Sequence, residues 1–301
     1  MGIGHYIKDI GRGKDGARAL GRAQAADLMG QVLDQQVSDL ELGAFCIAMR
    51  IKGETPEEMA GFLDATHARL NKVQTGHAPT VVLPSYNGAR KLPVLTPLLA
   101  HLLAREGIAV VMHGTPTEST RITSQDVLGA MGVTALSQIR AVQAGEVVFA
   151  PTEVLCPNLK RLLDVRRIVG LRNPAHSLVK LMNPTTETNA LLVSSYTHPE
   201  YAVSMAATFE LTGSRALLLR GTEGEVVADA RRIPQMAAFV RGTRTALVEA
   251  QGGSLIKLPE LPTDIDAAST ARYTQAVLKG ELPVPAPLAA QVQAVLKALS
   301  L

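Results

Sequence analysis

Basic side chains are concentrated in two stretches of this 301-residue chain, and clustered Lys and Arg residues are groups that bind phosphate. Residues 158–182 carry six basic side chains against one acid, and residues 8–22 carry five against two. The first stretch contains Lys160, Arg161, Arg166, Arg167, Arg172 and Lys180, and the second contains Lys8, Arg12, Lys14, Arg18 and Arg22. Subtraction gives +5 and +3, whereas the whole chain has a formal charge of +3, so the remainder must be acidic overall. This segregation predicts a local positive field, although a run of charge is also typical of an ordinary solvated helix face.

A second group of polar residues follows an expected strand. Ser85 and Asn87 begin a loop that continues to Arg90 and Lys91 and then enters a helix. Backbone amides of small residues and a helix N-terminus can hold a phosphate at such a junction. An ordinary strand-to-helix connection is the alternative.

The loop after the next expected strand carries hydroxyl, imidazole and guanidinium groups. Its candidate residues are His113, Thr115, Ser119 and Arg121. Ligands in open α/β sheets bind at the C-terminal ends of parallel strands, so the position supports a site. A lone His at a strand end also commonly makes only structural hydrogen bonds, and that alternative stays open.

Composition excludes several classes of protein and of site. Hydrophobic residues make up 47% and charged residues 19%, which is typical of a globular protein, while aromatic residues are only 3% with no Trp. A surface built mainly on base stacking is therefore not expected. Residues 11–16 match G-x-G-x-x-G, but a helical pattern precedes them, so we expect a basic turn and no dinucleotide site.

Cysteine and histidine usage points to a reducing compartment without a metal centre. Cys46 and Cys156 lie in apolar settings and are expected to be buried thiols in the cytoplasm. The seven His residues form no zinc-binding pattern, so we expect no metal site. No apolar stretch is long enough to span a membrane, and the start does not resemble a signal peptide.

The elements that must position these residues change character near residue 75. Earlier segments read as helices over 5–11, 23–33, 40–52 after Asp39 as a cap, and from a Thr55–Pro56–Glu58 capping box to about Lys72. Later segments alternate helical stretches with β-branched runs at 81–83, 108–112, 147–149, 191–194, 216–219 and 225–227. Such alternation predicts a mainly parallel sheet with helices on its faces, interrupted at 158–182 by two consecutive helices. We therefore expect an α/β protein with an all-helical N-terminal domain, 1–74, completed by helices from about 157–183, and a larger α/β domain, 75–301.

Several motifs resemble anthranilate phosphoribosyltransferase over about residues 5–245. They are RIKGET at 50–55, HG at 113–114, DVL at 126–128, Arg172 and MNP at 182–184. The resemblance implies that family's fold, in which a small helical domain packs on a larger α/β domain. It also implies a dimer formed through the helices.

The catalytic motifs of that enzyme are altered here. PSYNG at 84–88 stands in place of its Gly-Thr-Gly-Gly-Asp diphosphate loop, and GTEGEV at 221–226 offers no clear equivalent of its magnesium-binding Asp-Glu pair. Val94 replaces an Asn, Met112 a Lys, Thr115 and Pro116 an Asn and an Arg, and Val179–Lys180 a Gly-Pro. Diphosphate and Mg²⁺ need converging carboxylates and unhindered amides, so the changes argue against the enzyme's reaction.

The altered segments resemble instead the YbiB-type relatives of this enzyme. The matching strings are IGRGK at 10–14, DLELG at 39–43, PSYNGARK at 84–91, HPEY at 198–201 and GTEGEV at 221–226. That family is described as binding DNA with little sequence preference, so the resemblance implies such an activity. The match is weak beyond about Leu261, and the role of that region stays open.

We predict a homodimeric, cytoplasmic nucleic-acid-binding protein without a cofactor, with DNA as the first candidate partner and RNA as the second. The predicted phosphate contacts are Arg12, Lys14, Arg18, Arg90, Lys91, Lys160, Arg161, Arg166 and Arg167. A phosphoribosyltransferase using Mg²⁺ and phosphoribosyl pyrophosphate on an unusual substrate is the alternative. Its cleft would contain Ser85, Asn87, His113, Thr115, Ser119, Arg121 and Arg172. A third interpretation is a protein whose basic surface meets an acidic protein partner.

Overall fold

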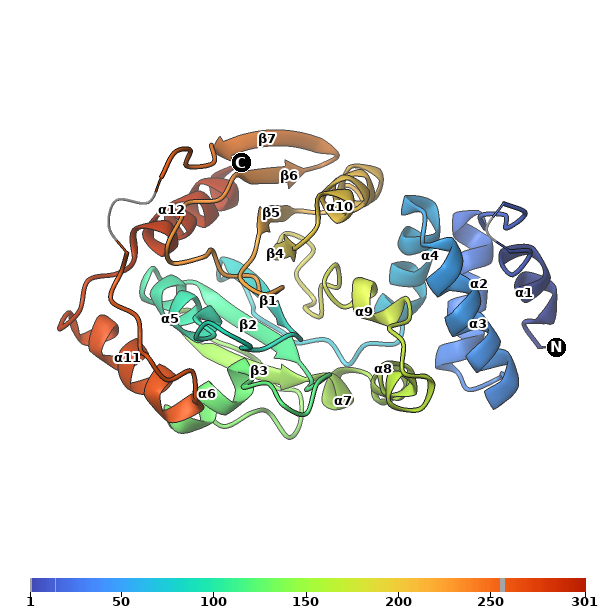
Figure 1. Cartoon of the computed structure of the whole chain (residues 1–301), viewed down its shortest axis with the longest axis horizontal. Helices are drawn as coiled ribbons and strands as arrows, with labels where there is room; N and C mark the ends of the chain where they lie inside the picture. Colours follow the sequence, from blue (N-terminus) through green and yellow to red (C-terminus); the bar gives the residue numbers. More distant parts are fainter. Residues whose placement is uncertain (1, 14, 255–257) are drawn as a thin grey trace. The chain divides into compact units, whose positions relative to one another are not determined.

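The structure, a computed structural model, describes residues 2–13, 15–254 and 258–301. It divides into two compact units, of which the first comprises 1–71 and 152–184 and the second 72–151 and 185–301. Figure 1 labels their helices and strands. The fold class predicted from the sequence, a small helical N-terminal domain with a larger α/β domain, is confirmed.

The first unit is all helical. Its helices are α1 (Gly4–Ile10), α2 (Arg22–Leu33), α3 (Asp39–Lys52), α4 (Pro56–His67), α7 (Thr152–Leu155), α8 (Pro157–Val169) and α9 (Ala175–Leu178). The capping box at Thr55 is confirmed, because its side chain accepts the Glu58 amide and Glu58 accepts the Thr55 amide. Two details of the prediction are wrong: Ser38 rather than Asp39 caps α3, in a box with Glu41, and α4 ends at His67 rather than about Lys72.

A buried carboxylate anchors the first unit. Glu58 is completely buried, and its carboxylate accepts hydrogen bonds from the Leu20 amide at 2.9 Å and from Lys52 Nζ at 2.6 Å. The bond from Leu20 fixes the chain between α1 and α2, and the pair with Lys52 fixes the end of α3. One side chain thus joins the segment before α2 to the α3–α4 connection, 38 positions away from it.

The second unit is a seven-stranded sheet in the order β3-β2-β1-β4-β5-β6-β7. The strands are β1 (Thr80–Ser85), β2 (Ala109–Gly114), β3 (Val147–Pro151), β4 (Leu191–Tyr196), β5 (Ala216–Arg220), β6 (Met236–Val240) and β7 (Thr243–Val248). Strands β1 to β5 pair in parallel, while β6 and β7 add antiparallel pairs at one edge. The sheet is therefore mainly parallel, as predicted.

Among the described residues of this unit, the helices that accompany the sheet are α5 (Thr96–Arg105), α6 (Ser124–Ala130), α10 (Pro199–Thr212), α11 (Ala267–Lys279) and α12 (Ala286–Ser300). Helices α10 and α12 both contact β4, β5 and β6 and lie on opposite faces of the sheet, and α5 packs beside α12 (Figure 1). The inner strands read as continuous apolar runs because both of their faces are buried.

The strand predicted at 225–227 is wrong. Those residues lie in the irregular segment between β5 and β6, although they are buried as strand residues would be. The segment is fixed by other contacts, since Gln291 of α12 donates to the Val226 carbonyl at 2.7 Å and accepts the Ala228 amide at 2.8 Å. In the described part of the chain, none of the helices combines the length and apolar character needed to cross a membrane.

A closed anion loop and a basic helix as candidate sites

The loop after β1 has a backbone conformation that few sequences permit. Gly88 has φ +70°, and a Cβ on it would lie 2.6 Å from the carbonyl oxygen of Ile122. The Ala89 amide donates to that same oxygen at 2.7 Å, which holds the loop against the segment before α6. Residues 85–92 therefore form a fixed turn. Five other backbone amides of this turn donate to residues outside it.

Glu225 receives the first two of these amides. Its Oε1 accepts the backbone N–H groups of Asn87 and Gly88, both at 2.8 Å. Its Oε2 lies 2.6 Å from Ser85 Oγ and 3.2 Å from Thr96 Oγ1. Only 2% of Glu225 is exposed, so the carboxylate is a buried anion whose hydrogen bonds are supplied by the loop and by the start of α5.

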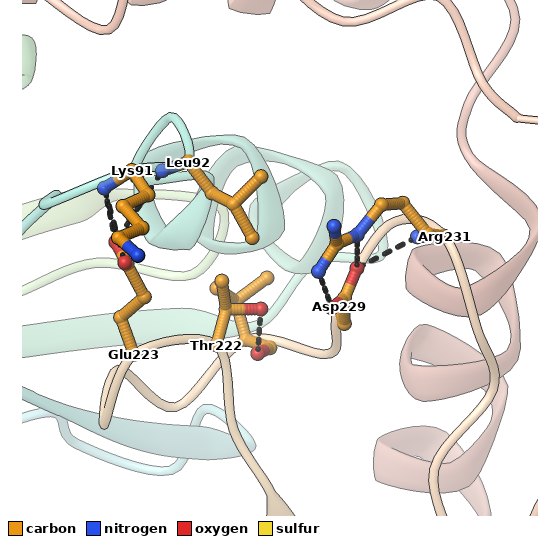
Figure 2. A network of polar contacts seen from close by, with 7 residues as sticks. Lys91, Leu92, Thr222, Glu223, Asp229 and Arg231 are labelled. Carbon is orange, nitrogen blue, oxygen red and sulfur yellow. Dashed lines mark hydrogen bonds and ion pairs between the residues drawn. The ribbon is translucent and has the colours of Figure 1, made fainter.

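Glu223 receives the next three amides. Its Oε2 accepts the Arg90 amide at 2.7 Å and the Leu92 amide at 3.4 Å, and the Lys91 amide lies 3.0 Å from Oε1. Figure 2 shows this carboxylate pointing at the Lys91–Leu92 backbone from the opposite segment. Glu223 itself has φ +53°, a left-handed conformation that is uncommon for a residue with a side chain.

The turn that carries both glutamates is held from several sides. Gly224 has φ +90°, and a Cβ there would lie 2.0 Å from Asn87 Nδ2, which donates to the Glu223 carbonyl. The Thr222 hydroxyl donates to the Val227 carbonyl at 3.1 Å, which closes the turn (Figure 2).

Further along the same segment, Asp229 pairs with Arg231. Burial opposes ionisation of Asp229, but the hydrogen bonds from Arg231 outweigh that effect and hold the pKa of Asp229 below its usual range.

The structure brings part of the predicted cleft together around this loop. Ser85 and Asn87 contact Glu225, and Arg121 Nη1 lies 3.3 Å from the Asn87 carbonyl. His113 is fully buried, with Nδ1 2.9 Å from the Tyr86 hydroxyl, and therefore belongs to the sheet interior behind the loop.

The other predicted cleft residues are more scattered. Thr115 is buried, and its hydroxyl has no hydrogen-bond partner within the described residues. Ser119 is exposed in the loop that follows β2. Arg172 is exposed and belongs to the helical unit rather than to the unit that holds the loop.

Two residues of this site were not predicted, Glu223 and Glu225. In the sequence they stand out only as a poor match to a magnesium-binding pair. The signal that could have found them is the spacing of Glu223-Gly224-Glu225 directly after a strand, since alternate carboxylates around a glycine can both turn toward a neighbouring loop. Among the described residues no three His, Cys, Asp or Glu side chains converge as metal ligands.

The second candidate site is α8. Its buried residues Leu159, Leu162 and Leu163 face the helical unit, so the basic residues occupy the remaining surface. Arg161 bonds Gln35 Oε1 at 2.7 Å and Asp39 at 3.2 Å, and Lys160 pairs with Asp164. These contacts leave the helix with a clear excess of positive charge.

The C-terminal end of α8 is the most open part of this helix. Arg167 has 67% of its side chain exposed and reaches Asp164 only at 3.4 Å, while Arg166 is half-buried beside it. The helix ends at Gly170, which has φ +77°. Basic residues in a last turn complement the helix dipole, so Arg166 and Arg167 also have a purely structural reason to be there.

The remaining predicted basic residues lie elsewhere. Arg12 and Arg18 lie in the segment after α1, where Arg12 bonds the Lys8 carbonyl, and Lys14 lies outside the described residues. Helix α1 contacts α3, whereas α8 contacts α2, and α1 and α8 are drawn apart in Figure 1. Arg90 and Lys91 are exposed on the loop of the second unit.

The two cysteines are buried, in settings that do not activate a thiol. Burial raises the pKa of the Cys46 thiol to about 12 and raises that of Cys156 as well. Both are free thiols, and neither lies in the electropositive, accessible setting that activates a cysteine nucleophile.

Comparison with known proteins identifies relatives for nearly the whole chain. Residues 5–69 match the helical bundle domain of the glycosyl transferase family. The uncharacterized protein YbiB of Escherichia coli K12 is 42% identical over 292 residues, which cover 95% of this chain and 91% of that protein. Anthranilate phosphoribosyltransferase of Methanopyrus kandleri is 28% identical over 93% of this chain and 84% of the enzyme.

A solved structure has the same fold. The crystal structure of anthranilate phosphoribosyltransferase from Thermus thermophilus superposes with a TM-score of 0.73, covering 97% of this chain and 87% of that one. The identity between the two is 24%, so this likeness concerns the fold alone.

Proposed function

The chain belongs to the family of the Escherichia coli protein YbiB, which is related to anthranilate phosphoribosyltransferase, and we propose that it is a nucleic-acid-binding protein on a scaffold that no longer carries out phosphoribosyl transfer. The observation that carries the proposal is the pair of contrasting sites. The loop that would hold a phosphoribosyl ligand is filled by the chain's own carboxylates, whereas α8 presents basic side chains at the surface.

The electrostatic argument rests on α8. Four cations, Lys160, Arg161, Arg166 and Arg167, stand against one acid within a single helix. Surface ion pairs such as Arg167–Asp164 contribute only about 0–1 kcal/mol, so a phosphate can replace the carboxylate partner at little cost. Basic side chains of this kind contact the phosphate backbone of the nucleic acid and not the edges of its bases, so binding has little sequence preference.

The burial of the aromatic residues supports phosphate contacts over stacking. All five Phe residues are buried in the two cores, and Tyr6, Tyr86 and Tyr273 are buried as well. Stacking of bases needs exposed aromatic faces. The exceptions are Tyr201, which is 40% exposed, and the half-buried Tyr196, and both belong to the other unit. Helix α8 itself has no aromatic residue, so it can offer phosphate contacts but no stacking face.

A dimer through the helical unit forms part of the proposal. Helix α3 carries an apolar stripe of Leu40, Ala44, Ile47 and Ile51, spaced at helical intervals, whose two ends are the most open, with Leu40 84% and Ile51 62% exposed. Arg161 of α8 bonds Asp39, the neighbour of Leu40, so the stripe begins beside the basic helix. A second copy on this stripe would double the basic surface. DNA as a partner and two buried thiols both suit a cytoplasmic protein.

Charge reversal on α8 is the experiment that tests the proposal. The double variant Arg166→Glu/Arg167→Glu is expected to weaken binding to a mixed-sequence duplex at least about tenfold at moderate salt, because two phosphate contacts become repulsions. The matched control is Arg272→Glu/Lys279→Glu, which makes the same charge change on the exposed face of α11 and should leave binding within about twofold. Equal losses in both variants would contradict a localised site on α8, and no loss in either would contradict the proposal.

The enzyme alternative predicts a different result with phosphoribosyl pyrophosphate. Its Mg²⁺–diphosphate group does not fit the residues present, since the loop amides that would hold a diphosphate already bond Glu225 and Glu223. We expect phosphoribosyl pyrophosphate with Mg²⁺ to change the melting temperature of the protein by less than about 1 °C, because a ligand stabilises only by binding the native state. A rise of several degrees, reproduced by calorimetry, would favour the enzyme.

A further inference from the structure

We propose that the turn at residues 221–225 acts as an internal anionic ligand. The carboxylates of Glu223 and Glu225 bind a cradle of backbone amides at residues 87–92 that suits a diphosphate, and they thereby keep such ligands out. The observation behind this inference is the convergence of five backbone N–H groups, from Asn87, Gly88, Arg90, Lys91 and Leu92, on Glu223 and Glu225. It is independent of nucleic-acid binding by α8.

The amides define what kind of ligand the cradle suits. Successive backbone N–H groups that face one way form a concave anion site, and carboxylate and phosphate oxygens are acceptors of the same kind. Here the amides fall into two adjacent sets, one on each carboxylate. A ligand that replaced both would need two neighbouring anionic groups, which is the chemistry of a diphosphate.

The surroundings add donors to the same place. Ser85 and Thr96 direct hydroxyl groups at Glu225, and the exposed residues Arg90 and Lys91 flank Glu223. Each carboxylate position therefore has donors besides its amides or a cationic residue next to it, hydroxyl groups at Glu225 and basic residues at Glu223. The acidic residues come from more than 130 positions away, so they are not a local capping motif of the loop.

The backbone of the turn shows that placing these carboxylates has a cost. Glu223 is held at φ +53°, and Gly224 at φ +90° has no room for a side chain against Asn87. A non-glycine residue in the left-handed region is retained only where the surrounding contacts over-determine it. The three amides that bond the Glu223 carboxylate supply those contacts.

Removal of the carboxylates is expected to open the cradle to inorganic pyrophosphate. The variant Glu223→Ala/Glu225→Ala should melt below the wild type, and pyrophosphate at about ten times its dissociation constant should raise the melting temperature of this variant by about 3–6 °C at matched ionic strength. Wild-type protein should shift by less than about 1 °C, because its amides are already bonded. Isothermal titration should show one pyrophosphate per chain for the variant only.

A matched control separates this rescue from general stabilisation by anions. Glu146 also accepts a backbone amide, from Gln143, and pairs with Arg140 on the surface of the same unit, so Glu146→Ala should lose stability without recovering it in pyrophosphate. If the double variant does not fold, Glu223→Ala alone decides with inorganic phosphate as the probe, since this change frees only the three amides that bond Glu223 and leaves Glu225 on its own two. Equal stabilisation of wild type, or no stabilisation of a folded variant, overturns the inference.

Discussion

Raising the salt concentration from 50 to 200 mM is expected to weaken binding of this protein to duplex DNA by about 10²–10⁴-fold. Each phosphate that is neutralised releases condensed counterions, and log K falls with log salt at about −0.9 per phosphate. Helix α8 supplies four cations per chain and eight per proposed dimer. Engagement of half to all of them gives a slope of about −4 to −7, and a fourfold change in salt converts that slope into the stated range.

The slope also tests how binding is achieved. Since the Phe residues are buried, no large salt-independent component from stacking should remain at high salt. The measurement is a binding isotherm at several salt concentrations, with the melting temperature recorded at each to exclude unfolding. Arg166→Glu/Arg167→Glu should flatten the slope, whereas Arg272→Glu/Lys279→Glu should not. An affinity that hardly changes with salt would contradict a phosphate-based interface.

Local chemistry explains which parts of the fold the sequence predicted well. The Thr55–Pro56–Glu58 capping box needs only neighbouring residues, and it forms as predicted. The parallel strands were recognisable because an apolar β-branched run buried on both faces has a signature of its own. Ser38 and Asp39 were confused because adjacent residues of both types cap helices, although the Ser38-x-x-Glu41 spacing is that of a capping box and favours Ser38.

Distant pairings explain what the sequence did not predict. Glu225 lies in a Glu-Val-Val run that reads as a strand, yet its environment is set by Ser85 and Asn87, which are 140 and 138 positions away. The role of Glu223 depends likewise on amides near residue 90. The Glu223-Gly224-Glu225 spacing after a strand hints at paired carboxylates, but it does not identify the backbone amides near residue 90 as their partners, so the closed loop became visible only in three dimensions. The basic character of α8, in contrast, was readable because charge is carried by residue type.

Disrupting the apolar stripe of α3 should have the second large effect. We expect Leu40→Asp/Ile51→Asp to convert the proposed dimer into a monomer, because each change places a charge in a surface that a second copy would bury. Both side chains are already exposed within one chain, so the fold of the monomer should survive. Analytical ultracentrifugation measures the change of mass, and circular dichroism tests the fold.

The same variant should lose affinity for DNA in a length-dependent way. A dimer holds two α8 surfaces, and the second contact on a long duplex is intramolecular, which raises affinity without any new kind of contact. Loss of the proposed dimer should therefore weaken binding to a long duplex about 10–100-fold and roughly halve the slope of log K against log salt. A duplex so short that it contacts only one α8 surface should bind almost as tightly as it binds the wild type. Val203→Asp/Leu211→Asp on α10 is the matched control, since it also charges exposed apolar positions but lies in the other unit. A monomer that binds long duplexes as tightly as the wild type would show that each chain binds on its own, and would remove the dimer from the mechanism.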